Sequence, residues 1–179
     1  QSGFARTGKK FGFEHYEVKA DLICCGKGIS SGFPLSAVLG SNEVMDLPEV
    51  GNMSSTHSAN PISCASGMAT IQEIERLDLV DETERKGNIL FKSLDELKKT
   101  FSNQISYTLG EGLIAAIIFD DNVEKTKISE ICEIAMQNGI LLVHTGRESI
   151  KLGPPLTITD DALVEGLDVL EHSIKKVLG

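Results

Sequence analysis

Lys27 is the residue of this sequence whose setting most directly suggests chemistry. It stands between Gly26 and Gly28, just after the short apolar run at residues 22–25. Glycines carry no Cβ atom, so a flat ligand could approach the backbone on either side of the lysine. A lysine amine that partly desolvated surroundings keep neutral attacks carbonyl groups and forms a Schiff base. The pattern therefore predicts a carbonyl-binding lysine, with a solvated turn lysine as the alternative.

A nucleotide-binding P-loop fits this glycine–lysine–glycine segment poorly. The Walker pattern requires Ser or Thr after the lysine and another glycine five positions before Gly26. Gly28 and Asp21 occupy those two positions here. The sequence therefore favours amine chemistry over nucleotide binding at Lys27.

Thr56 and Lys151 are two further candidates for binding groups. Thr56 lies in a hydroxyl-rich loop at residues 54–60, just before an expected helix, where amide donors and the helix dipole favour a phosphate. The alternative is that these hydroxyls satisfy their own turn and cap. Lys151 precedes the Pro-Pro-Leu segment at residues 154–156 and could bind a substrate carboxylate or form an ordinary surface salt bridge.

Hydrophobic periodicity and turn residues predict the elements that must position these side chains. The run at residues 22–25 predicts a strand buried on both faces of a parallel sheet, with Lys27 at its carboxyl end, where ligands collect in α/β sheets. Asn60 followed by Pro61 predicts a helix start. The other expected elements are strands at residues 34–40, 113–119, 140–143 and 149–152, and helices at residues 42–45, 61–77, 81–101, 128–137 and from 159 or 160 onward.

A change of sequence character near residue 79 predicts two parts. Before it, the order of strands and helix indicates part of an α/β layer, and after it the pattern indicates a smaller α+β domain. We therefore expect residues 1–79 to belong to one domain and residues 80–179 to another.

The composition restricts the partners and the compartment. The 179 residues include 17 basic and 26 acidic side chains, and the net charge of -9 argues against nucleic acid or an anionic membrane as the main partner. No apolar run approaches the roughly 20 residues that a bilayer span needs, and no targeting pattern is seen. The four cysteines have neither metal-ligand nor disulfide spacing, so no metal is expected and the reducing cytoplasm is the expected location.

Four stretches of the sequence resemble, in order, the class III (ornithine/4-aminobutyrate type) aminotransferases, which depend on pyridoxal 5'-phosphate. They are residues 1–8, QSGFARTG; residues 13–16, FEHY, with Asp21 and residues 26–30, GKGIS; residues 55–61, STHSANP; and residues 154–158, PPLTI. The resemblance covers nearly the whole sequence and corresponds to the C-terminal portion of the family. It implies an α/β fold of fold-type I. Residues 1–79 would form the C-terminal part of the large, mainly parallel-sheet cofactor domain, and residues 80–179 the small C-terminal α+β domain.

The resemblance implies roles for four residues by position. Lys27 would hold pyridoxal phosphate as a Schiff base, and Gln1 would hydrogen-bond the cofactor's phenolic oxygen. Thr56 would reach across a homodimer interface to the phosphate of the other subunit's cofactor. Lys151 stands where many members have an arginine that holds the substrate's α-carboxylate, and a lysine cannot make the bidentate contact of a guanidinium.

The implied function is an aminotransferase that moves an amino group from an amino acid, such as 4-aminobutyrate or another ω-amino acid, to a 2-oxo acid. Once freed, Lys27 would serve as general base and acid. The rival functions are a racemase, an aminomutase or a decarboxylase on the same fold, or a non-catalytic interaction module. The family's aspartate for the pyridine nitrogen would lie upstream of Gln1, so this sequence by itself is expected to form an incomplete site.

Overall fold

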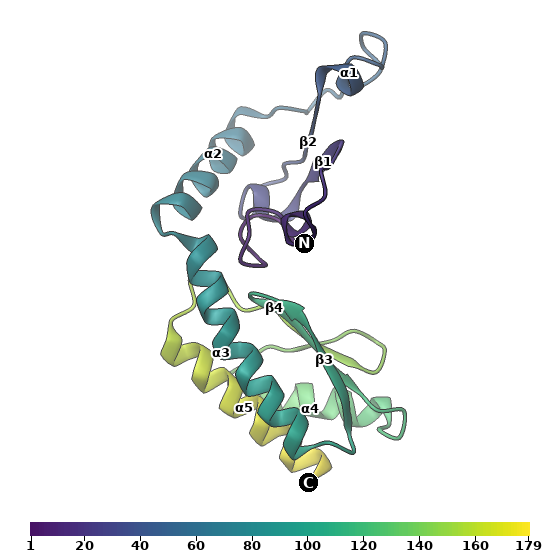
Figure 1. The fold of residues 1–179 in the computed structure, drawn as a ribbon, viewed down its shortest axis with the longest axis vertical. Coiled ribbons are helices and arrows are strands. Elements are labelled where there is room, and N and C mark those ends of the chain that lie inside the picture. The colour runs from purple at the N-terminus through teal and green to yellow at the C-terminus, as the bar shows by residue number, and fades with distance from the viewer. The chain divides into compact units, whose positions relative to one another are not determined.

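The computed structural model describes all residues, 1–179, and the chain forms two compact units. The first unit is Gln1–Val80 and the second is Asp81–Gly179 (Figure 1). This division lies beside the boundary expected near residue 79. The assignment of the two parts to a large and a small domain stays a prediction. Each unit is described by itself below.

The first unit contains short elements and one long helix. Its elements are the 3₁₀ helices η1 (Gly12–Tyr16) and η2 (Lys27–Ile29), the strands β1 (Leu22–Cys25) and β2 (Ala37–Gly40), and the helices α1 (Asn42–Met45) and α2 (Pro61–Arg76). The expected helix start at Asn60 is confirmed, because the Asn60 side chain accepts hydrogen bonds from the amides of Ile62 (3.0 Å) and Ser63 (3.3 Å). This cap fixes where the loop before α2 ends.

Residues 22–25 form the expected strand, but within these 179 residues its neighbour is an antiparallel strand and the burial on both faces is not seen. β1 pairs antiparallel with β2, in a register that places Cys25 opposite Ala37. Residues 26–36 are too short a connection for the helical crossover that joins parallel neighbours, whereas an antiparallel pair needs no crossover. Leu22 is 46% exposed and only Cys25 of the strand is buried, because the two-stranded sheet has no further layer over both faces.

The second unit is an antiparallel sheet covered on one face by helices (Figure 1). The strands β3 (Ile105–Glu111), β4 (Ile114–Phe119), β5 (Val143–His144) and β6 (Ser149–Leu152) are ordered β3-β4-β6-β5. The helices are α3 (Leu79–Thr100), which begins at the end of the first unit, α4 (Lys125–Gln137) and α5 (Asp160–Leu178). Strand β3 was not predicted, and only Val143 of the strand predicted at residues 140–143 is in β5.

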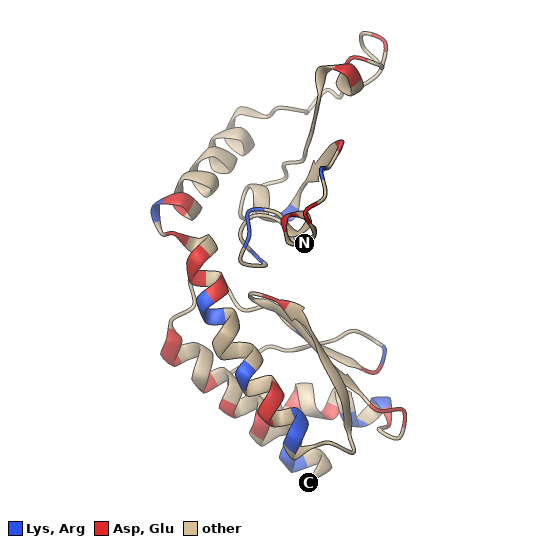
Figure 2. Cartoon of the chain, viewed as in Figure 1, with Lys and Arg blue, Asp and Glu red and all other residues tan.

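A single hydrophobic core holds this unit together. Leu90 and Leu94 of α3, Ile117 of β4, and Leu170 and Ile174 of α5 are each at most 1% exposed. Helical spacing of the leucines on α3 and α5 places them on the face toward the sheet, as expected from the sequence. Figure 2 shows that charged residues gather on these helices, whereas strands β3 and β4 carry few. None of the helices is both long and apolar enough to span a bilayer.

Candidate functional site

Lys27 is the first residue of η2 and follows β1 after one glycine. Its side chain is exposed, and its backbone φ of 46° is in the left-handed region that non-glycine residues seldom adopt. No hydrogen bond or ion pair involves its amine in this chain. The surrounding segment therefore holds a lysine in an uncommon backbone conformation and leaves its amine free to react.

The segment after Lys27 is anchored on α2. Ile29 is 8% exposed and Ser30 is 1% exposed, so both residues are buried. The Ser66 hydroxyl of α2 donates a hydrogen bond to the Ser30 carbonyl at 2.8 Å. A Cβ atom added at Gly67 would lie 2.7 Å from a methyl group of Leu35, which shows how closely this segment packs on α2. The turn that carries Lys27 is thus supported from one side.

The two glycines beside Lys27 differ in the space around them. A Cβ atom added at Gly26 would meet nothing within 4 Å, whereas one at Gly28 would lie 3.5 Å from the Phe4 side chain. The backbone at Gly26 is therefore open to a ligand, as the sequence pattern suggested. At Gly28 an added Cβ atom would make only ordinary van der Waals contact with Phe4.

Thr56 is exposed in the loop before α2, and its hydroxyl makes no hydrogen bond in the chain. The neighbouring Ser54 and Ser58 hydroxyls are used locally, by donation to the carbonyls of Gly51 (2.9 Å) and Ser55 (2.7 Å). The Asn60 cap already engages two of the first amides of α2. A phosphate near Thr56 would therefore be bound by its free hydroxyl more than by the helix N-terminus.

Gln1 is the exposed first residue of the chain. Gln1, Lys27 and Thr56 all belong to the first unit, but no contact joins their side chains in this structure. The fourth candidate, Lys151, belongs to the second unit. The structure therefore places each candidate in its element and does not by itself assemble them into one site.

Lys151 lies on the sheet face that the helices leave open. Its neighbours in the strand, Ile150 and Leu152, are 0% and 8% exposed and point into the core, so the alternation of a strand turns Lys151 to the other face. The register pairs Lys151 with Ala116 on β4 and with Val143 on β5. Lys151 is thus a half-buried cation with an apolar residue beside it on each neighbouring strand. It forms no ion pair with a carboxylate of the chain.

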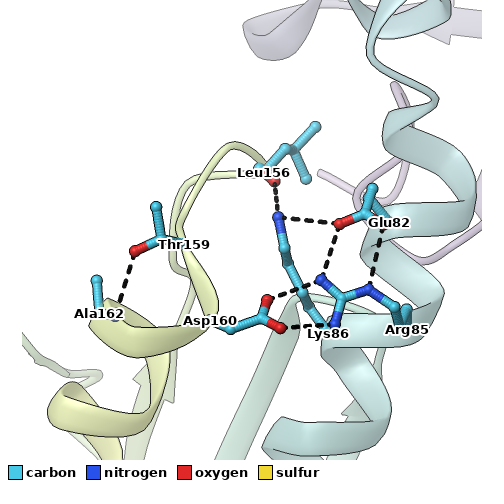
Figure 3. Close-up of polar contacts among 7 residues, drawn as sticks. All are labelled: Glu82, Arg85, Lys86, Leu156, Thr159, Asp160 and Ala162. Atoms are coloured by element: carbon cyan, nitrogen blue, oxygen red, sulfur yellow. Dashed lines mark hydrogen bonds and ion pairs between the residues drawn. The ribbon is translucent and has the colours of Figure 1, made fainter.

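The connection from β6 to α5 is held by a polar network that was not among the predicted features (Figure 3). Arg85 of α3 donates two hydrogen bonds to the Asp160 carboxylate, at 2.8 and 2.7 Å, and two more to the Glu82 carboxylate, at 3.1 and 2.9 Å. The amine of Lys86 lies 3.4 Å from Glu82 and 3.5 Å from the Leu156 carbonyl. The hydrogen bonds from Arg85 hold the pKa of Asp160 below its usual range.

Only part of this network had a signal in the sequence. Glu82 precedes Arg85 and Lys86 by three and four residues, a spacing that brings side chains together on one helix face. The contacts to Leu156 and Asp160 join residues 70 and 75 positions apart and had no local signal.

Residues 1–174 match the family described as aminotransferase class-III. The 4-aminobutyrate aminotransferase of Mycobacterium leprae is 36% identical over 178 residues, which cover 96% of this chain and 40% of that protein. The leucine/methionine racemase of Thermococcus litoralis is 35% identical over 183 residues, with 99% of this chain and 41% of that protein covered. The acetylornithine aminotransferase structure from Elizabethkingia anophelis superposes with a TM-score of 0.90 at 33% identity, covering 98% of this chain and 44% of that one.

Proposed function

This chain belongs to the class III aminotransferase family, whose members depend on pyridoxal phosphate, and from this premise we propose that it carries out amino-group transfer from an amino acid to a 2-oxo acid. The chain spans 40% of the length of the Mycobacterium relative. The proposal therefore concerns the complete enzyme, which here means this chain together with the rest of the class III fold.

The residues of the first unit fit this cofactor chemically. Lys27 supplies an exposed primary amine without a partner, which is the group that attaches covalently to an aldehyde. Gly26 leaves open space beside it. Thr56 and Gln1 have exposed polar side chains that suit the phosphate of a partner subunit's cofactor and the phenolic oxygen, respectively. When bound, pyridoxal phosphate supplies the acceptor for the electrons that the substrate releases.

Lys27 then performs the proton transfer in this proposal. In the complete enzyme the Lys27 Nζ atom would take the proton from the substrate's Cα and deliver it to the cofactor's C4′ carbon. A flexible lysine side chain on an anchored turn suits this proton transfer. The fixed backbone would keep the amine within reach of both the carbon that loses the proton and the carbon that receives it. The anchors are the buried residues Ile29 and Ser30.

Lys151 binds the substrate's carboxylate in this proposal. Lys151 is a half-buried cation on an apolar sheet face, and its ammonium has no carboxylate partner in the chain. A substrate carboxylate would supply the missing negative charge. An ammonium makes a point-charge contact with one carboxylate oxygen at a time, unlike the bidentate guanidinium. We therefore propose that Lys151 contacts the α-carboxylate of the 2-oxo acid acceptor, and that an ω-amino acid such as 4-aminobutyrate is the donor.

The position of Lys27 at the end of β1 carries this proposal, and covalent trapping tests it. The complete enzyme is incubated with pyridoxal phosphate, reduced with borohydride and digested, and the modified peptide is identified by mass spectrometry. We expect a pyridoxyl adduct on Lys27 and none on Lys19, an exposed lysine of the same unit. A folded, cofactor-saturated enzyme without an adduct at Lys27 would contradict the proposal.

A racemase is the second candidate, because the Thermococcus racemase is as similar as the transferases. The two reactions differ in their need for an acceptor. An aminotransferase consumes a 2-oxo acid in equal amount to the amino donor, whereas a racemase inverts one amino acid without any acceptor. We expect turnover of 4-aminobutyrate to depend on added 2-oxoglutarate or pyruvate. Inversion of an L-amino acid in the absence of an oxo acid would favour the racemase.

A further inference from the structure

The turn that carries Lys27 is held in a backbone conformation that its own residues do not favour. Lys27 and Ser31 have φ angles of 46° and 52°, both in the left-handed region. Each residue carries a Cβ atom, so this conformation is strained at both positions. Strain of this kind persists only where surrounding contacts restrain the backbone. The contacts that restrain this turn therefore decide where the Lys27 amine lies.

One hydrogen bond from α2 is the strongest candidate for such a restraint. The Ser66 hydroxyl donates to the Ser30 carbonyl at 2.8 Å, across 36 positions of the sequence. Ser30 is 1% exposed, and the other donor to its carbonyl, the Phe33 amide, lies at the long distance of 3.5 Å. Loss of the Ser66 hydroxyl would therefore leave a buried acceptor with one weak donor. The free-energy penalty is of the same order as the strain at Lys27, so this single bond can decide whether the strained turn persists.

The restraint at Ser30 reaches Lys27 through a closed turn. The Ile29 amide donates to the Gly26 carbonyl at 3.3 Å, and this hydrogen bond encloses Lys27 and Gly28. Gly28 is therefore held inside a hydrogen-bonded ring, which limits its freedom. Ile29 is 8% exposed and is buried together with the adjacent Ser30. Release of Ser30 would loosen Ile29 and open the turn, and Lys27 could then leave its strained conformation.

We propose that Ser66 of α2 is a positioning residue that keeps the Lys27 amine where it can attack the aldehyde carbon of bound pyridoxal phosphate. This inference rests on the cofactor-binding role proposed above for Lys27, and all the residues involved belong to the first unit. The amine adds to the aldehyde carbon and water leaves, so the rate of attachment to a bound cofactor depends on where the amine lies. A small free aldehyde has no such requirement, because it can approach the exposed amine from many directions. A purely structural role for Ser66 would not distinguish the two aldehydes.

The test measures covalent attachment to Lys27 in the complete enzyme after removal of its cofactor. The enzyme is mixed with saturating pyridoxal phosphate or with formaldehyde, timed samples are reduced with borohydride, and mass spectrometry quantifies the modified Lys27 peptide. For Ser66→Ala we expect attachment of pyridoxal phosphate to slow about three- to tenfold. Modification by formaldehyde should proceed at the original rate. Ser66→Thr retains the hydroxyl and should restore most of the rate with pyridoxal phosphate.

Thr70→Val is the matched control within the same helix. The Thr70 hydroxyl donates to the Ser66 carbonyl, also at 2.8 Å, so this variant removes a hydrogen bond of equal length that does not involve the Lys27 turn. We expect both rates of attachment to stay unchanged.

The outcomes separate the positioning role from the proposed function. An unchanged rate for Ser66→Ala, equal slowing by Ser66→Ala and Thr70→Val, or equal slowing with both aldehydes overturns the positioning role while the cofactor role of Lys27 stands. If the enzyme with its original sequence forms no pyridoxyl adduct at Lys27, both are overturned. Should Ser66→Ala fail to fold, Ser66→Cys, whose thiol is a weak donor, is subject to the same comparison.

Discussion

Replacement of Lys27 with alanine is expected to lower kcat of the complete enzyme by about 10²- to 10⁴-fold, the range that loss of a positioned general base produces. The structure indicates that this loss will be chemical. The Lys27 side chain is exposed and has no partner, so its removal breaks no contact. Its φ of 46° strains alanine about as much as lysine, because both carry a Cβ atom. Folding should therefore be preserved while turnover is lost.

The measurement is single-turnover kinetics with saturating donor, alongside far-ultraviolet circular dichroism. Lys19→Ala removes another exposed lysine of the first unit and should leave kcat unchanged. Lys27→Arg keeps the positive charge but supplies no neutral amine at ordinary pH, so it should be as inactive as the alanine variant. A small primary amine added to Lys27→Ala should restore part of the rate. Turnover of Lys27→Ala within a few-fold of the unmodified enzyme would refute the assignment.

The elements that could be predicted are those with local signals. Asn60 and Pro61 define the start of α2 because the cap and its amide donors are within three residues of each other. The start of α5 is similar, because the Thr159 hydroxyl accepts a hydrogen bond from the amide of Ala162. In both cases the chemistry that begins the helix is contained in a few consecutive residues.

The errors in the predicted strands have two different sources. Residues 140–143 are apolar enough for a strand, but the Ile140 amide donates to the Ala135 carbonyl at 3.0 Å and so completes the end of α4. Strand β3 alternates apolar and polar residues, which is a local strand signal that the sequence analysis missed. Its pairing with β4 is what makes it a strand.

The candidate site shows the same limit. Lys27 could be singled out because its two glycine neighbours adjoin it in sequence. The contact of Lys86 with the Leu156 carbonyl could not be predicted, because the two residues are 70 positions apart. The antiparallel pairing of β1 with β2 was not predicted for a related reason, because the residues of one strand do not determine which strand lies beside it. Local motifs thus indicated the candidate lysine, and tertiary contacts determine what supports its backbone.

Replacement of Gly110 with alanine is expected to destabilise the second unit by about 3 to 5 kcal/mol, more than an ordinary substitution. Gly110 lies in β3, opposite Ala115 of β4, with a φ of 137°. A Cβ atom there would collide with the Ile114 carbonyl oxygen and lie 2.7 Å from the Cα atom of Ala115. Both contacts are with backbone of the paired strand, so relief requires the hairpin itself to move.

Alanine substitutions at two other glycines distinguish the two causes of destabilisation expected for Gly110→Ala, which are steric collision of the added Cβ atom and backbone strain at positive φ. Gly139 also has a positive φ, 95°, but an added Cβ atom would meet nothing within 4 Å, so Gly139→Ala should cost only the strain of about 1 to 2 kcal/mol. Gly153→Ala has neither penalty and should stay within about 0.5 kcal/mol of the original chain. Urea unfolding followed by circular dichroism gives the three values. Equal losses for Gly110→Ala and Gly139→Ala would show that the hairpin relaxes freely, which contradicts a rigid β3–β4 pairing.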